Sequence, residues 1–152
     1  YIRIRFKDLR FGLSSIIALL HDVLVVLAFY AVARVSVSNT FVACMLTIVG
    51  YSINATIVIF DRIRENMATM THKDDLKDIV DKSVTQTMSR SIFTSLTTFI
   101  MVAVLYVLGV TSIRDFALPL MVGIVCGAYS SICLAGSLWY VFRQKFLPKK
   151  DK

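Results

Sequence analysis

Four long runs of apolar residues constrain the fold of this chain more than any other feature. They cover residues 11–33, 40–60, 92–113 and 116–142, and the last three contain no charged residue. An α-helix needs about 20 apolar residues to cross the hydrocarbon core of a bilayer, so each run is long enough to span it. With 57% hydrophobic residues, the chain is too apolar for an ordinary soluble domain. The sequence therefore predicts an all-α, polytopic bundle of four transmembrane helices in a lipid bilayer.

Lysine and arginine residues are divided unequally between the two sides that four crossings define. The N-terminal segment, the 61–91 loop and the C-terminal tail hold 15 of the 17 basic residues, and the opposite loops hold only Arg34 and Arg114. By the positive-inside rule, both ends of the chain and the long loop are predicted to lie in the cytoplasm, at the cell membrane. The net charge is +7, but the basic residues flank the apolar runs instead of forming a patch with stacking aromatic residues. This placement argues against nucleic-acid binding.

The long loop contains one amphipathic segment. Apolar residues recur every three to four positions between Leu76 and Met88, with charged residues between them. Thr71, three residues before Asp74, is a plausible helix start. We therefore expect a cytoplasmic amphipathic connector helix over residues 74–88. Its placement stays open between the membrane face, the underside of the bundle and a solvated connector.

Small residues indicate where helices approach each other closely. Gly123, Gly127 and Ser131 repeat every four residues in the last apolar run, and we expect this stripe to pack against a neighbouring helix. Gly50 lies four residues before Asn54 and shares its helix face, which predicts a second close contact. The Asn54 amide needs a polar partner because lipid offers none, and it is either a packing contact or part of a polar transport path.

Ionisable and polar residues inside the predicted spans are further candidates for function. His21 and Asp22 lie near the middle of the first span, where ionisable side chains are costly and often functional. This pair either exchanges protons or joins helices by hydrogen bonds. Arg90 precedes the third span and shares a helix face with Thr94. Its guanidinium either extends to the cytoplasmic headgroups or faces the bundle, where it holds a carboxylate ionised.

No catalytic or cofactor motif is present in the sequence. It contains no Gly-x-Ser-x-Gly, no Gly-rich phosphate loop of the usual spacings and no Cys-x-x-Cys, and its two histidines form no metal-binding motif. Cys126 and Cys133 are about 10 Å apart along one helix, which is too far for a disulfide. We therefore predict that the chain is not an enzyme and binds no cofactor or metal.

Several stretches of the chain, in the same order, resemble the SecF family of protein-export membrane subunits. They are residues 18–22, 50–54, 58–66, 94–98 and 116–131, and together they span nearly the whole chain. The resemblance implies a subunit related to proton-driven transporters of the resistance–nodulation–division type. Such a subunit works with a SecD-like partner and assists the Sec translocon channel in moving exported, unfolded polypeptides, using the proton gradient. Family members carry two further helices and an extracytoplasmic domain upstream, which implies that Tyr1 begins inside a longer protein.

One residue departs from the family pattern. The residue after Asn54 is commonly Asp, a candidate proton carrier, but in this chain it is Ala55. Arg90 matches the family's membrane arginine, the proposed partner of that carboxylate. Alanine cannot bind a proton, so the resemblance implies that the SecD-like partner or Asp22 supplies the carboxylate. Two other functions stay open: a small-molecule or lipid exporter of the same superfamily, and a structural assembly subunit without its own proton coupling.

Overall fold

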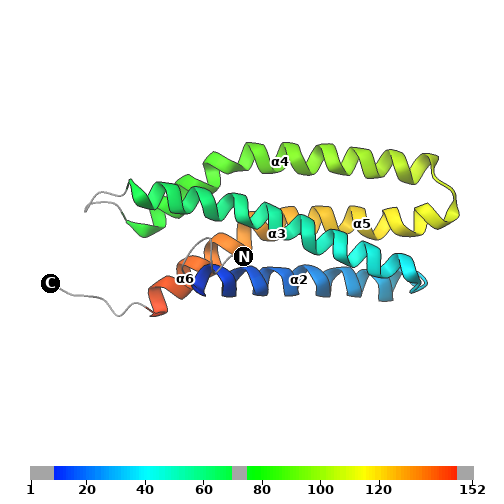
Figure 1. The fold of residues 1–152 in the computed structure, drawn as a ribbon, viewed down its shortest axis with the longest axis horizontal. Coiled ribbons are helices and arrows are strands. Elements are labelled where there is room, and N and C mark those ends of the chain that lie inside the picture. The colour runs from blue at the N-terminus through cyan, green and yellow to red at the C-terminus, as the bar shows by residue number, and fades with distance from the viewer. Residues whose placement is uncertain (1–8, 70–74, 147–152) are drawn as a thin grey trace.

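The chain runs the length of a helical bundle four times in the computed structural model, which describes residues 9–69 and 75–146 (Figure 1). Its elements are five α-helices and a π-helical segment, in the order α2 (Leu9–Ala33), α3 (Asn39–Ala68), α4 (Leu76–Leu108), α5 (Thr111–Tyr129), η1 (Ser130–Ala135) and α6 (Gly136–Phe146). The segment η1 joins α5 and α6 without a break, and we call these three elements together the last helical path. Within the described ranges, four helices are long and apolar enough to cross a membrane. The predicted all-α bundle with four spans is confirmed.

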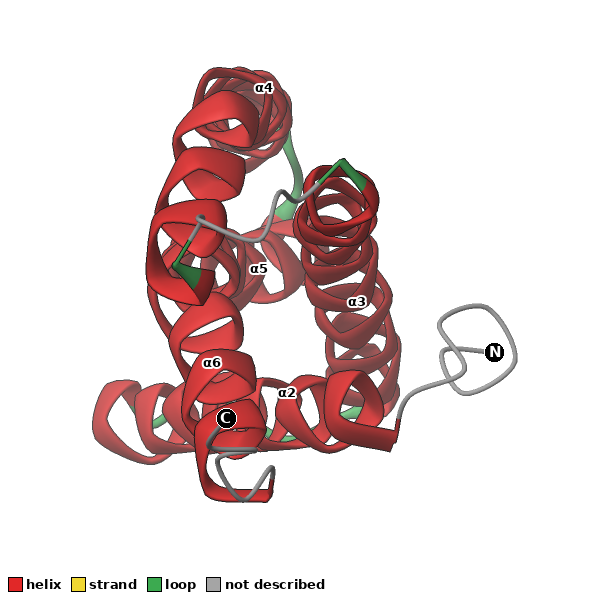
Figure 2. Cartoon of the chain, turned by 90° about the vertical axis from the view of Figure 1, so that its left-hand side faces the viewer, coloured by secondary structure: helices red, strands yellow, loops and turns green. Residues whose placement is uncertain are grey.

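The two ends of the bundle differ in their content of basic residues. The start of α2, the end of α3, the start of α4 and all of α6 lie at the left-hand end in Figure 1, and the connections after α2 and α4 lie at the other end. Figure 2 is a view of this left-hand end. It shows α5 between α4 at the top and α2 at the bottom, with α3 on the right. Most basic residues of the described helices are therefore at one end, which we call the basic end, and Arg34 and Arg114 are at the other.

Two helices extend farther than the apolar runs predicted. Helix α3 continues to Ala68, past the charged residues that begin at Asp61, and α4 already begins at Leu76. The segment predicted as a connector helix over residues 74–88 is helical from Leu76, but it is continuous with the apolar part of α4. No glycine or proline interrupts α4 before Gly109, so the change from polar to apolar residues does not end the helix. The predicted start at Thr71 and Asp74 lies outside the described residues.

Side-chain hydrogen bonds join the extended parts of α3 and α4. The Asn66 amide nitrogen donates to the Ser83 hydroxyl at 2.7 Å and to Oε1 of Gln86 at 3.0 Å. The Arg62 Nε donates to the same Gln86 oxygen at 2.8 Å. These contacts pair the two helix extensions with each other at the basic end, so the amphipathic segment packs against α3.

A layer of buried polar residues separates two apolar clusters in the bundle. The cluster near the basic end comprises Phe11, Ala18, Ile59, Phe60, Ile63, Val80, Ala135 and Trp139. The cluster toward the other end comprises Val26, Tyr30, Cys44, Ile48, Val102, Ala117, Leu120 and Ile124. Between them, α2, α3 and η1 contribute side chains that are at most 1% exposed, namely Asp22, Ser52, Thr56, Ser130 and Ser131. We call these five residues the buried polar layer.

The glycines that were predicted to mark helix contacts have different surroundings. A Cβ atom at Gly123 would overlap the side chain of Ile48 on α3. At Gly127 it would lie 3.7 Å from the Ser52 Cβ and 3.8 Å from an Asp22 carboxylate oxygen, which are ordinary contact distances. No atom of the described structure lies within 4 Å of a Cβ at Gly50, so the structure shows no close approach there.

We predict that Gly123→Ala destabilises the bundle and that Gly127→Ala does not. The added methyl group at position 123 forces Ile48 to move, with an expected cost of about 1–3 kcal/mol. At position 127 it fits, and the better helix propensity of alanine raises stability by up to about 1 kcal/mol. The measurement is the unfolding free energy of the detergent-solubilised protein. Equal effects at both positions would show that the Ile48 contact does not limit packing.

Candidate functional site

The carboxylate of Asp22 lies in the interior of the bundle. Asp22 is about 20 Å along α2 from its first residue and is 1% exposed. It is buried because it shares one helix face with Ser15, Ala18 and Val26, which repeat at the three-to-four-residue spacing of an α-helix and are all buried. A carboxylate at this position lacks water, so neighbouring helices must provide its hydrogen bonds.

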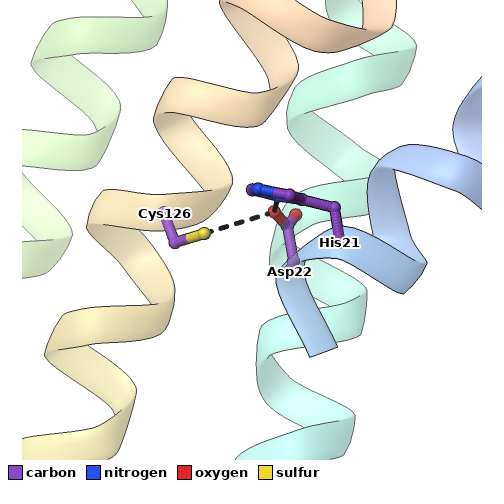
Figure 3. Close-up of side chains that lie close together, drawn as sticks. All are labelled: His21, Asp22 and Cys126. Atoms are coloured by element: carbon purple, nitrogen blue, oxygen red, sulfur yellow. Dashed lines mark hydrogen bonds and ion pairs between the residues drawn. The ribbon is translucent and has the colours of Figure 1, made fainter. Parts of the chain in front are cut away.

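Three other side chains and the adjacent histidine surround this carboxylate. The hydroxyls of Ser52, on α3, and of Ser130, in η1, both donate to Oδ2, the latter at 2.9 Å. On the other carboxylate oxygen, Oδ1, the Cys126 thiol donates at 3.5 Å and His21 Nδ1 lies at 3.3 Å. Figure 3 shows the imidazole and the thiol approaching the same carboxylate from α2 and α5. We call these five residues the Asp22 cluster.

Two local features of the last helical path bring it close to Asp22. Position 127 has room only for a small residue, because a Cβ atom there would already be in contact with Ser52 and Asp22. The π-helical segment begins three residues later, and its wider turn directs both Ser130 and Ser131 into the bundle. Ser130 reaches Asp22, and the Ser131 hydroxyl lies 3.3 Å from that of Thr56 on α3. The irregular helix thus satisfies polar groups on two other helices.

A second polar region lies between α3, α4 and the last helical path. It is a small cavity of about 70 Å³, which we call the Arg90 cavity, lined by Tyr51, Asn54, Ala55, Val58, Arg90, Ser91, Thr94, Ser95, Ala128 and Ser131. Ala55 and Arg90 both line it, although they are on different helices. Ser131 connects the two polar regions, because it lines this cavity and bonds to Thr56 within the buried polar layer.

Most hydroxyl groups of α4 bond to their own helix. Thr94 donates to the Arg90 carbonyl at 2.8 Å, and Ser95 donates to the Ser91 carbonyl at the same distance. Because the Ser95 proton is used in this way, the hydroxyl of Tyr51 on α3 is the donor in its 2.6 Å contact with the Ser95 oxygen. This bond joins α3 to α4 beside the Arg90 cavity.

The structure divides the predicted polar residues into two groups. His21 and Asp22 belong to the Asp22 cluster, whereas Asn54, Arg90 and Thr94 line the Arg90 cavity. Sequence reasoning missed three members of the cluster: Ser52, Cys126 and Ser130. The sequence did contain one signal for Ser130, since it lies three residues after a glycine of the small-residue stripe. No local signal relates Cys126 to Asp22, because these residues are 104 positions apart.

The comparison with protein families decides the classification. The family model described as "Protein export membrane protein SecD/SecF, C-terminal" matches residues 1–145. The chain belongs to the SecD/SecF protein-export family. It is therefore a multi-pass membrane protein, in agreement with its four membrane-length helices.

Individual SecF-type relatives agree with this classification. The chain is 52% identical to protein translocase subunit SecF of Alicyclobacillus acidocaldarius over its whole length, which is 50% of that protein. It is 42% identical to protein translocase subunit SecDF of Bacillus subtilis, with 99% of this chain and 20% of that protein covered. The chain thus spans about half the length of the curated SecF relatives that it matches.

A solved SecDF structure has the same fold in the matching region. The crystal structure of SecDF, a translocon-associated membrane protein from Thermus thermophilus, superposes with a TM-score of 0.89 at 43% identity. The match covers 95% of this chain and 20% of that protein. The bundle of α2 to α6 therefore corresponds to one part of a larger membrane protein in that relative.

We predict that Ser130→Ala destabilises the bundle by about 1–2 kcal/mol, because it removes a buried donor from the Asp22 carboxylate. The control is Thr97→Ala, since the Thr97 hydroxyl is exposed and bonds only to carbonyls of its own helix. Its effect should stay within about 0.5 kcal/mol. Denaturant unfolding in detergent measures both variants, and equal stability of the two would show that Ser130 does not hold the carboxylate.

Proposed function

We propose that the protein containing this chain is an accessory subunit of the Sec protein translocase that assists proton-gradient-driven export of unfolded polypeptides. Its partners would be a SecD-like subunit and the translocon channel. Membership of the SecD/SecF family and the names of the relatives support this proposal. In this proposal the subunit binds its partners and changes conformation, and it catalyses no reaction of its own.

The observation that carries the proposal is the shared position of Ala55 and Arg90 on one polar cavity. In the family pattern, an Asp at position 55 faces the membrane arginine. The cavity has the arginine and five hydroxyl-bearing side chains, three of them serines, but it has no carboxylate among its lining residues. We infer that the SecD-like partner supplies the titrating carboxylate and that Arg90 pairs with it when the group is ionised.

The orientation of the bundle follows from the same proposal. The basic end would lie in the cytoplasm, because positively charged residues near membrane helices are retained on that side. The extended parts of α3 and α4 would then project into the cytoplasm, and the connections at Arg34 and Arg114 would face the opposite side. The first and last described residues, Leu9 and Phe146, lie at the basic end and would therefore be on the cytoplasmic side.

Cysteine labelling tests the orientation. A cysteine in place of Asp81, an exposed residue of the α4 extension, should be shielded from a membrane-impermeant maleimide in intact cells. A cysteine in place of Ser36, in the exposed connection after α2, should react. Both variants are made in a background without Cys44, Cys126 and Cys133. Labelling at position 81 without labelling at position 36 would reverse the proposed orientation.

An export assay tests the function. We expect the full-length protein to restore export of a secreted reporter in cells depleted of their own SecF, and to lose this effect when the proton gradient is collapsed. Arg90→Gln should abolish the gradient-dependent part of export, because a neutral amide cannot form an ion pair with a partner's carboxylate. The matched control is Arg114→Gln, at the opposite end of the bundle, which should keep at least about half of the activity.

Two further variants identify the source of the carboxylate. Asp22→Asn should leave gradient-driven export nearly intact, because coupling is assigned to the partner. Ala55→Asp should assemble normally, because the new carboxylate lines the same cavity as Arg90. An Asp22→Asn variant that assembles but no longer responds to the gradient would overturn the assignment to the partner. Full export without any gradient response in wild type would favour the structural assembly subunit.

A further inference from the structure

The Asp22 cluster contains three groups that are ligands of transition metals. His21 offers an imidazole nitrogen, Asp22 a carboxylate oxygen and Cys126 a sulfur, and these atoms all lie within 4.8 Å of one another. Figure 3 shows them converging from α2 and α5 on one point. We propose that these three side chains form a binding site for one thiophilic divalent cation, of which Zn²⁺ is the type.

The distances between the ligand atoms fit a tetrahedral zinc site. Zinc bonds of about 2.0 Å to oxygen and nitrogen and about 2.3 Å to sulfur place the oxygen about 3.3 Å from the nitrogen and about 3.5 Å from the sulfur. In the structure, Asp22 Oδ1 is 3.3 Å from His21 Nδ1 and 3.5 Å from Cys126 Sγ. Two of the three ligand-to-ligand distances therefore already have the required length, and the third, between nitrogen and sulfur, is at most 4.8 Å.

The charges of the three ligands also suit a dication inside a membrane. Binding replaces the Cys126 thiol proton, which leaves to solvent, and the imidazole of His21 keeps its single proton on Nε2 so that Nδ1 faces the ion. A dication, one thiolate, one carboxylate and a neutral imidazole have a net charge of zero. A neutral complex avoids the large free-energy penalty that an unpaired charge has in a hydrocarbon surrounding.

The remaining contacts of the cluster orient the carboxylate for this role. Ser52 and Ser130 both donate to Oδ2 of Asp22, which leaves Oδ1 directed at the imidazole and the thiol. Hydrogen bonds of this kind fix the position of a metal-binding carboxylate and raise the affinity of the site. The two carboxylate oxygens of Asp22 thus have different roles: Oδ1 would bind the cation, and Oδ2 accepts the hydrogen bonds of the two hydroxyls.

Two of the three ligands lie at the surface of the described bundle. The His21 side chain is 39% exposed and Cys126 is partly exposed, whereas the Asp22 side chain is 1% exposed. The imidazole and the thiol can therefore be reached from the side of the bundle between α2 and α5. Once bound, the cation joins α2 to α5 directly and stabilises the folded bundle in proportion to its affinity.

Cobalt binding tests this inference independently of protein export. Co²⁺ is added to the purified full-length protein in detergent, and we expect a thiolate-to-cobalt charge-transfer band with one Co²⁺ per chain, lost on addition of Zn²⁺. Cys126→Ser should remove the band, whereas the matched variant with both Cys44→Ser and Cys133→Ser should keep it. A wild-type protein without the band, or a Cys126→Ser variant that keeps it, would overturn the proposal.

Two other variants test the site without changing the thiol. His21→Gln should weaken Co²⁺ binding, and Ser130→Ala should weaken it by about 10- to 100-fold, the usual effect of losing a group that supports a metal ligand. The second readout is the rise in melting temperature on adding Zn²⁺, which is expected for wild type and absent in Cys126→Ser. Unchanged affinity in both His21→Gln and Ser130→Ala would contradict the ligand set.

Discussion

The hydrogen bonding of the buried Asp22 carboxylate is the constraint on which the arrangement of the bundle depends. Hydrocarbon provides no hydrogen bonds, so a carboxylate in the interior fixes the rotation of every helix that must donate to it. Ser52 from α3 and Ser130 from η1 meet on the same oxygen. Helix α2, helix α3 and the last helical path therefore have one relative position in which this group is satisfied, and the apolar clusters on either side pack around it.

The same constraint accounts for the irregular shape of the last helical path. A bulky side chain at position 127 would keep α5 too far from α2, and the small residue there avoids this. The π-helical segment then places two consecutive serines where two different helices need hydrogen-bond partners. Segments of this type are uncommon and occur frequently at functional sites. In this chain the segment lies beside Asp22, the one carboxylate that is buried among the described residues.

The Arg90 cavity and the Asp22 cluster are separate polar regions with different surroundings. The cavity is lined mainly by exposed and half-buried residues of α3 and α4, whereas the carboxylate of the cluster is buried between α2, α3 and the last helical path. Ala55 lines the cavity and does not belong to the cluster. The cluster contains its own carboxylate and a thiol from Cys126, whereas the lining of the cavity contains a cation and no carboxylate.

The order of residues alone determined the fold class, the number of spans, the basic end and the family. Each of these depends on local composition: an apolar run of membrane length, the side on which arginines and lysines occur, or a motif read along one segment. The same reasoning misplaced the start of α4, because a change in polarity marks the membrane boundary and not the end of a helix. Only the tertiary structure decided which side chains meet. Cys126 and Ser130 reach Asp22 from more than 100 positions away because Gly127 and the π-helical turn set the distance and rotation of one helix against another, and neither quantity is encoded in local spacing.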